Sequence, residues 1–270
     1  MAWLRTAALL AMLVFVSAAA SSATALRIAS DISYAPLEFY APHSQRVEGF
    51  DYDLAQSLGK KLGRPVLFAN HAFNTMIDGL SGGKFDLVIS AMSDTRAREK
   101  QVDFIDYFLA GSGILVHKGN PEHIFNLAGL CGMTVDLEKG TAQEAAVKEQ
   151  SAKCVGVGLG PISILSFTSD GDALRAFLAG KSMAHISDYP VVAYLARTLD
   201  GGNRFEVGGR QFGVVPYGIA VSKKNPSLRN AVQSSLAALV AAGAYERLLK
   251  KWGLGQGALR SAPINAGTLF

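Results

Sequence analysis

Short apolar runs alternate with amphipathic stretches along most of the chain. Residues 85–89 form one such run, which follows the glycine pair Gly82-Gly83 and is too short and too β-branched for a buried helix. This pattern predicts an interior strand that ends in the segment 90–93. A helix should follow, with Asp94 or Thr95 as its N-terminal cap.

The same alternation predicts the remaining elements. Leu54, Leu58 and Leu62 recur every four residues, which predicts a helix that ends at Gly63, and the acids near its start are expected to complement the helix dipole. Further strands are predicted at 27–29, 66–68, 114–116, 133–135, 162–167, 183–186, 205–207 and 213–221, and further helices at 173–178, 227–241 and 244–252. Strands and helices alternate in this order in α/β proteins.

One helix start carries a specific signal. Thr141 and Glu144 form a capping box directly after Gly140. A helix that opens after a strand and a glycine can bind an anion, and an ordinary cap is an equally good interpretation.

A short pattern occurs twice and suggests two similar lobes. Gly83-Lys84, four residues and Ile89-Ser90 match Gly180-Lys181, four residues and Ile186-Ser187. The predicted organisation is a signal peptide at 1–25, a first lobe at 26–112 and 213–253, a second lobe at 113–212, and a loose tail at 254–270.

The two copies differ in the charge that follows them. One continues to Arg98 and the other to Asp188. Ligands sit at the carboxyl ends of strands in open α/β sheets, a guanidinium pairs with a carboxylate, and an aspartate pairs with an ammonium. Two lobes with opposite charges are therefore predicted to close on a zwitterion.

Loops at two other strand ends add candidate residues. Asp31 and Tyr34 follow the first strand, and Phe73 follows the second. Tyr34 and Phe73 can sandwich a ligand side chain that Asp31 faces. The alternatives are that Asp31 caps its own turn and that Phe73 belongs to the core.

The N-terminus predicts export. Arg5, an apolar run at 7–16 and the sequence Ala23-Thr24-Ala25 are typical of a signal peptide cleaved after Ala25, with Ala20 as the alternative. The apolar run is too short for a membrane anchor. Hydrophobic residues make up 49% of the chain and its net charge is only +4 with scattered basic residues, which argues against a disordered chain and against nucleic-acid binding.

Cys131 and Cys154 are the only cysteines. In an exported protein a pair of cysteines favours a disulfide, which would contribute about 3 kcal/mol by constraining the unfolded chain. No histidine lies at ligand spacing from them, so no metal site is predicted, and no motif indicates a cofactor or an enzyme.

Several motifs together resemble one family. They are D-x-x-Y-A-P at 31–36, G-F-D-x-D-L at 49–54, S-x-x-S and T-x-x-R at 90–98, V-D-F at 102–104, G-T-x-Q-E at 140–144 and K-K-W-G at 250–253. Over residues 27–252 the chain is similar to the bacterial extracellular solute-binding proteins that feed polar amino acids to ABC importers, in particular the histidine and lysine/arginine/ornithine binders. The resemblance implies a monomeric periplasmic protein with a two-lobed type II fold, a two-crossover hinge and a membrane permease as partner.

The resemblance also implies roles for individual residues. Arg98 would hold the ligand α-carboxylate with the backbone N–H groups of Ser93 and Ala142, and Asp188 would hold the α-amine with Ser93 and the carbonyl of Ala91. Relatives often have a hydroxyl residue where Ala142 and Ala91 stand here. The full set expected to bind ligand is Asp31, Tyr34, Phe73, Ser90, Ala91, Ser93, Arg98, Thr141, Ala142, Gln143 and Asp188.

Two other functions fit parts of the sequence. The same fold also resembles that of the periplasmic cyclohexadienyl dehydratases. Asp31 or Glu38 is the candidate general acid for such an enzyme. A sensor or docking module is the third interpretation. The binding-protein hypothesis predicts a cationic ligand, because a carboxylate at Asp31 repels glutamate in a closed cleft.

Overall fold

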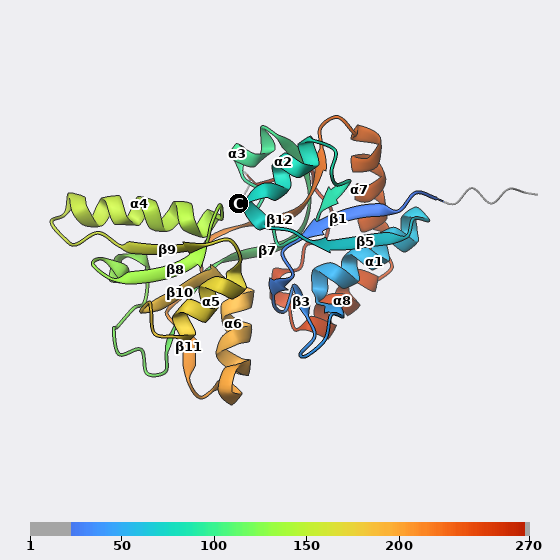
Figure 1. Cartoon of the computed structure of the whole chain (residues 1–270). Coiled ribbons are helices and arrows are strands. Elements are labelled where there is room, and N and C mark those ends of the chain that lie inside the picture. Colours follow the sequence, from blue (N-terminus) through green and yellow to red (C-terminus); the bar gives the residue numbers. More distant parts are fainter. Residues whose placement is uncertain (1–22, 268–270) are drawn as a thin grey trace, which may run out of the picture.

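The computed structural model describes residues 23–267 (Figure 1). Its strands are β1 (Leu26–Ser30), β2 (Ser33–Tyr34), β3 (Glu38–Tyr40), β4 (Val47–Glu48), β5 (Val66–Asn70), β6 (Leu87–Val88), β7 (Val102–His117), β8 (Thr134–Glu138), β9 (Ser163–Phe167), β10 (Ala184–Asp188), β11 (Phe205–Val207) and β12 (Phe212–Ser222). Its α-helices are α1 (Phe50–Leu62), α2 (Met76–Ser81), α3 (Arg96–Glu99), α4 (Ala142–Gly156), α5 (Asp170–Leu178), α6 (Tyr189–Thr198), α7 (Pro226–Ala241) and α8 (Ala244–Trp252). Short 3-10 turns lie at Phe73–Thr75 (η1), Leu127–Leu130 (η2), Leu199–Gly202 (η3) and Gly255–Gly257 (η4).

Two lobes share one strongly curved sheet, whose strand order is β5-β1-β6-β12-β7-β10-β8-β9. The long strand β7 belongs to both lobes: its start pairs with β12, and its end pairs with β10 and β11. The first lobe holds β1, β5, β6, α1–α3, α7 and α8, and the second holds β8–β11 and α4–α6 (Figure 1). The chain passes between the lobes along β7 and returns along β12. The fold is the predicted two-lobed α/β architecture.

Buried apolar side chains explain why these elements form. Leu54 and Leu58 of α1 are fully buried, and Gly63 adopts the left-handed conformation that ends the helix. The largest core cluster continues from the first lobe to α6 and β11 of the second. A separate cluster lies under α4, between β8 and β10. The lobes are thus packed bodies that carry a site at their shared edge.

The predicted disulfide is present. Cys131, after η2, is bonded to Cys154 near the end of α4, with 5.6 Å between their Cα atoms. Both cysteines belong to or pack against the second lobe's core cluster, which also contains the buried Val147. Within 23–267, no helix is long and apolar enough to cross a membrane. The predicted signal peptide lies largely outside the described residues.

The prediction of a loose tail was wrong for residues 254–267. Asn265 Oδ1 accepts a hydrogen bond from the backbone N–H of Phe104 at 2.7 Å, and its Nδ2 donates to Asp103. The N–H groups of Ala266 and Gly267 donate to Asp106 and Asp94. The tail therefore lies against β7 and ends beside α3 (Figure 1).

Two other expectations need correction. The strand predicted at 133–135 is shifted and longer, because β8 runs from Thr134 to Glu138. The loop after β1 contains strands too short to recognise from a pattern, and β2, β3 and β4 form a small sheet of their own.

Candidate functional site

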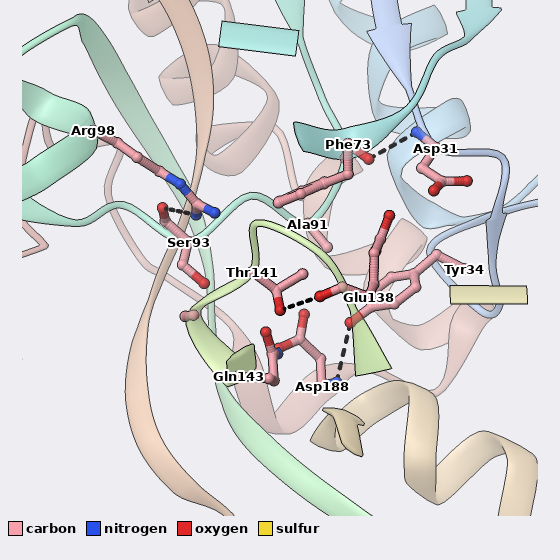
Figure 2. A pocket seen from close by; sticks show the side chains of 12 residues that line it. Asp31, Tyr34, Phe73, Ala91, Ser93, Arg98, Glu138, Thr141, Gln143 and Asp188 are labelled. Carbon is pink, nitrogen blue, oxygen red and sulfur yellow. Dashed lines mark hydrogen bonds between the residues drawn. The ribbon is translucent and has the colours of Figure 1, made fainter. Parts of the chain in front are cut away.

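A narrow cavity lies between the lobes, where β1, β6, β8 and β10 end. Figure 2 shows Arg98 at one side of it and Asp31 at the other, with Asp188 from the second lobe below. Its lining consists of Asp31, Tyr34, Phe73, Ser90, Ala91, Ser93, Arg98, Glu138, Thr141, Ala142, Gln143 and Asp188. The structure thus brings together all eleven residues that the sequence singled out, and Glu138 is the additional one.

Arg98 is held in place by four neighbours. Thr95, the cap of α3, accepts a hydrogen bond from the Arg98 backbone N–H. The guanidinium donates to the carbonyl of Ser93 at 2.8 Å and, across the cleft, to that of Gly140 at 3.0 Å, and it lies 5.2 Å from the centre of the Phe73 ring. Burial lowers the pKa of Arg98 to about 10.

The loop that starts α4 reaches Arg98 because of a glycine. Gly140 has a φ of 81°, and a Cβ there would lie 2.8 Å from the Cβ of Asn74 in the first lobe. The predicted capping box is present: Thr141 Oγ1 accepts from the Glu144 N–H, and the Glu144 carboxylate accepts from the N–H of Gly140 at 2.7 Å. The N-terminus of α4 is therefore fixed at the cavity wall.

Asp188 lies at the end of β10, at the boundary with α6. Its carboxylate accepts a hydrogen bond from Gln143 Nε2, and its backbone N–H donates to the hydroxyl of Tyr34 at 3.0 Å. Ser187 Oγ lies 3.0 Å from the same hydroxyl. Burial raises the pKa of Asp188 to about 7. Tyr34 thus joins the first lobe to the strand end that carries Asp188.

A buried polar chain supports that strand end from behind. Ser187 Oγ lies 2.9 Å from Asp170, whose carboxylate is 3.5 Å from Nε2 of His185, and Nδ1 of His185 is 2.6 Å from Asp136. Burial alone would lower the pKa of His185, but Asp170 and Asp136 raise it. His185 therefore lies between two carboxyl groups inside the second lobe that favour its protonated form.

A second polar group supports the strand end of the first lobe. Ala91 has a positive φ of 44°, and its N–H donates to Asp51 at 2.8 Å. Tyr107 donates to the same carboxylate. Ser90 Oγ accepts from the N–H of Asp31 and donates to Glu38. Asp51 thus fixes the site backbone besides lying in the first turn of α1, and Glu38 supports Ser90 from outside the cavity lining.

Asp31 and Glu138 are the two remaining acids of the cavity. Each is only 4% exposed, and one comes from each lobe. Asp31 Oδ1 accepts from Ser33, whereas Asp31 Oδ2 and Glu138 Oε1 accept from no N–H or hydroxyl group among residues 23–267, and the two carboxyl groups can hydrogen-bond to each other when one is protonated. In Figure 2 the Glu138 side chain points toward Asp31. Burial raises both pKa values, and Asp31 raises that of Glu138 further.

Glu138 was missed because its strand was predicted to end at Val135. The signal is visible in retrospect: Glu138 ends β8 just before Gly140, as Asp188 ends β10. An acid at a strand end on the ligand side of the sheet is a candidate of the same kind as Asp188.

The wall therefore carries one guanidinium and three carboxyl groups. Such a cavity suits a zwitterion with an additional positive charge. Over the described part of the chain, no group of three or more His, Cys, Asp and Glu residues is arranged to hold a metal ion.

Known proteins are similar to this chain in sequence and in fold. Residues 26–256 match the model of the bacterial extracellular solute-binding proteins, family 3. The chain is 30% identical over 248 residues to the ABC transporter arginine-binding protein 1 of Escherichia coli, covering 91% of this chain and 96% of that protein. It is 29% identical over 233 residues to the arginine-binding protein ArgT of Corynebacterium glutamicum, covering 86% and 75%. It is 30% identical over 216 residues to the glutamine-binding protein GlnH of Bacillus subtilis, covering 78% and 74%.

Solved structures agree with this assignment. An ancestral arginine-binding protein bound to arginine matches with a TM-score of 0.77 at 33% identity, covering 85% of this chain and 97% of that one. An ancestral amino acid-binding protein described as a precursor of cyclohexadienyl dehydratase matches with a TM-score of 0.75 at 34% identity, covering 85% and 95%. The named relatives are binding proteins rather than enzymes, and this chain belongs to family 3 of the bacterial extracellular solute-binding proteins.

Proposed function

We propose that this protein is the periplasmic substrate-binding component of an ABC importer and that its ligand is a cationic L-amino acid. The observation that carries the proposal is the charge arrangement in the cavity: Arg98 stands apart from three buried carboxyl groups, Asp31, Glu138 and Asp188. An α-amino acid supplies one carboxylate and one ammonium. The two further acids then call for a positive charge on the ligand side chain.

Each end of the cavity has a defined role in this proposal. Arg98 binds the ligand α-carboxylate with the N–H groups of Ser93 and Ala142, and Asp188 binds the α-ammonium. The side chain then extends between Tyr34 and Phe73. The other cavity residues, Ser90, Ala91, Thr141 and Gln143, shape the walls and hold these groups in place.

Closure of the lobes completes the site. Lobes at 26–112 with 213–253 and at 113–212 would move about β7 and β12, which are the two crossings of the chain. Contacts such as Arg98 to Gly140 and Tyr34 to Asp188 then form together. The protein acts as a monomer and delivers its ligand to a membrane permease.

The names of the relatives support an amino-acid ligand and do not select one. Two of those described above are named for arginine and one for glutamine. Asp31 and Glu138 favour the cationic class, because a neutral amide leaves two desolvated acids without a countercharge.

A thermal-shift screen over the L-amino acids and ornithine tests the proposal. A ligand at a hundred times its Kd stabilises the folded state by about 2.7 kcal/mol, which raises Tm by about 5–10 °C for a chain of this size. We expect arginine, lysine, ornithine or histidine to give the largest shift, glutamine a smaller one and glutamate the smallest. A largest shift with glutamate would contradict the cationic class.

The rival function as a dehydratase has one feature in its favour. Glu138 is a buried carboxyl with a raised pKa at the cavity wall, as general acid catalysis requires. Incubation with prephenate or arogenate measures this directly. A binding protein should release no product above the rate of the buffer.

A further inference from the structure

We propose that Asp31 and Glu138 form a clamp, with one carboxyl group from each lobe, that closes on a guanidinium at the far end of the ligand. The inference rests on the proposed function, because it identifies the side chain that the amino-acid site selects. It assigns a specificity-determining role to Glu138, the cavity residue that the sequence analysis did not identify.

The position of the two acids is the first argument. Asp31 follows β1 in the first lobe, and Glu138 ends β8 in the second. Both line the cavity, and their carboxyl groups face each other beyond Ala91 as seen from Arg98 (Figure 2). They can act on one group only when the lobes are together, so the clamp forms on closure.

Their hydrogen bonding is the second argument. The oxygens Asp31 Oδ2 and Glu138 Oε1 accept no hydrogen bond from an N–H or hydroxyl group among residues 23–267, and each side chain is only 4% exposed. The two carboxyl groups are close enough to hydrogen-bond to each other when one of them is protonated. A donor on the ligand that lies between them can replace this shared proton and bond to both acids.

The chemistry of the donor is the third argument. A guanidinium is planar, carries five N–H donors and remains charged when buried, so its separate edges can reach two carboxyl groups at once. An ammonium is a compact and strongly hydrated charge that loses more hydration in a closed cavity. A neutral urea of the same shape has no charge to offset the two acids.

L-Citrulline supplies the matched probe, because it has the shape of L-arginine with a urea in place of the guanidinium. Calorimetry on ligand-free protein should show L-arginine binding at least about a hundredfold tighter than L-citrulline, and tighter than L-lysine, since a buried charged contact contributes about 2–5 kcal/mol. Equal affinities for L-arginine and L-lysine would overturn the assignment of a guanidinium.

Isosteric variants test Glu138 itself. Glu138→Gln should weaken L-arginine by at least about tenfold and leave L-citrulline within about threefold, so the ratio of the two affinities falls by about tenfold or more. Glu122→Gln, at an exposed position of the second lobe, is the matched control and should leave both affinities unchanged. An unchanged ratio in Glu138→Gln would overturn the clamp.

The two acids should also depend on each other. If they hold one group, the loss of arginine affinity in the double variant Asp31→Asn with Glu138→Gln should differ from the sum of the single losses by at least about threefold. Strict additivity would mean that they contact different groups. The Asp31 and Glu138 variants replace a buried acid with a neutral isostere, and equal or higher Tm values identify them as folded.

Proton release gives an independent measurement. Further charged groups face the pair: Asp172 and Glu38 lie near Asp31, and Asp170, Asp188 and Arg98 lie near Glu138. Burial and the surrounding acids favour a proton on the pair, and Arg98 opposes it. A guanidinium should displace that proton, and a urea should not. Calorimetry at pH 7 in buffers of different ionisation enthalpy should show more protons released with L-arginine than with L-citrulline. The difference cancels any contribution from Asp188, and a difference of zero would contradict the clamp.

The proposed function and the clamp fail in different ways. If no amino acid binds the wild-type protein, the proposed function is wrong. If amino acids bind and Arg98→Ala abolishes binding while Glu138→Gln leaves the arginine to citrulline ratio intact, the proposed function stands and the clamp is wrong.

Discussion

Burial favours the neutral forms of Arg98 and Asp188. It lowers the pKa of Arg98 to about 10 and raises that of Asp188 to about 7. Each group is therefore poised to gain more from an opposite charge than it would at the surface. The α-carboxylate and α-ammonium of an amino acid supply these charges at opposite ends of the backbone. Under the proposed function, these two residues account for selection of a zwitterion, before the ligand side chain is considered.

The role of Arg98 can be tested by substitution. Arg98→Ala should weaken amino-acid binding by at least about a hundredfold, because it removes the bidentate partner of the ligand carboxylate and leaves that charge unpaired. Arg98→Lys keeps the charge without the forked guanidinium, and its affinity should lie between those of the wild type and Arg98→Ala. Calorimetry measures the affinities, with Arg96→Ala, an exposed residue of the same helix, as the control.

An ordinary surface arginine at position 98 would pair with the neighbouring acids Asp94 or Glu99. In residues 23–267 the guanidinium forms no ion pair with either acid and bonds to backbone carbonyls instead. Near-native affinity in Arg98→Ala would nevertheless show that these contacts serve the fold alone.

Residue chemistry was predictable from the sequence where the local pattern carried it. Thr141 with Glu144 identified a helix start, and Arg98 and Asp188 followed the two copies of a repeated sequence pattern. Glu138 escaped because an apolar run rarely shows where its strand ends. Asp51 was interpreted as a helix-start acid, since nothing in the sequence indicates that Ala91, forty positions away, donates to it.

Among the elements, the C-terminal tail shows the limit of local patterns. Its segment 254–267 has no period that predicts a helix or strand, yet it pairs with β7 through isolated bridges at Ile264 and Ala258. The hydrogen bond between Phe104 and Asn265 joins positions 161 residues apart. Pairing over such a distance depends on the finished sheet and cannot be read from neighbouring residues.

The tail should contribute to stability through Asn265. Asn265→Ala leaves the N–H of Phe104 without its acceptor, and an unpaired buried donor costs about 1–3 kcal/mol. For a chain of this size we expect Tm to fall by about 2–10 °C. Differential scanning calorimetry measures the change.

Two comparisons complete this experiment. Arg260→Ala, at an exposed tail position, should unfold at the wild-type temperature. Ligand affinity should be retained in both variants, because Asn265 lies outside the cavity lining. A tail that is loose in solution would give the same Tm for Asn265→Ala and Arg260→Ala.

The disulfide also stabilises the arrangement of the elements. It joins the chain before β8 to the end of α4, and its two cysteines are 23 positions apart. Replacing both by serine should remove about 3 kcal/mol of stability and lower Tm by about 6–12 °C. The cavity contacts the other end of α4, about 20 Å along the helix, so the affinity should stay within about threefold. Calorimetric unfolding and binding titrations on the same sample decide, and an unaltered Tm would refute the stabilising role.

At the scale of the whole molecule, buried acids dominate the dependence on pH. Burial raises the pKa values of Asp51, Asp106 and Asp170 to about 6, that of Asp188 to about 7 and that of Asp94 to about 8. A raised pKa means that the folded state holds the proton more tightly than the unfolded chain. The stability that each such group contributes is present at low pH and is lost as pH rises through its folded pKa. The raised pKa of His185 acts with the same sign.

Exposed ion pairs act in the opposite direction. Arg27 and Lys223 neighbour Asp86 and Asp103, and hydrogen bonds with them lower the pKa values of these acids despite partial burial. Their contribution is present above the unfolded pKa of about 4 and is lost as pH falls further. The two sets together place the stability maximum near pH 4 to 4.5, just above the unfolded pKa values of the acids.

We therefore predict that Tm of the ligand-free protein is highest near pH 4 to 4.5 and falls as pH rises from there to about pH 8. Asp94 dominates the upper part of this range, since Asp106 and Glu99 face it and its pKa of about 8 is the highest of these five acids. Asp94→Asn, a neutral isostere, should flatten the decline above pH 7, whereas Asp200→Asn on the surface should not. Scanning calorimetry at half-unit steps of pH measures the profile. A Tm that rises from pH 6 to pH 8.5 would mean that the buried acids are ionised in the folded state without cost, and it would reverse the sign assigned to this network.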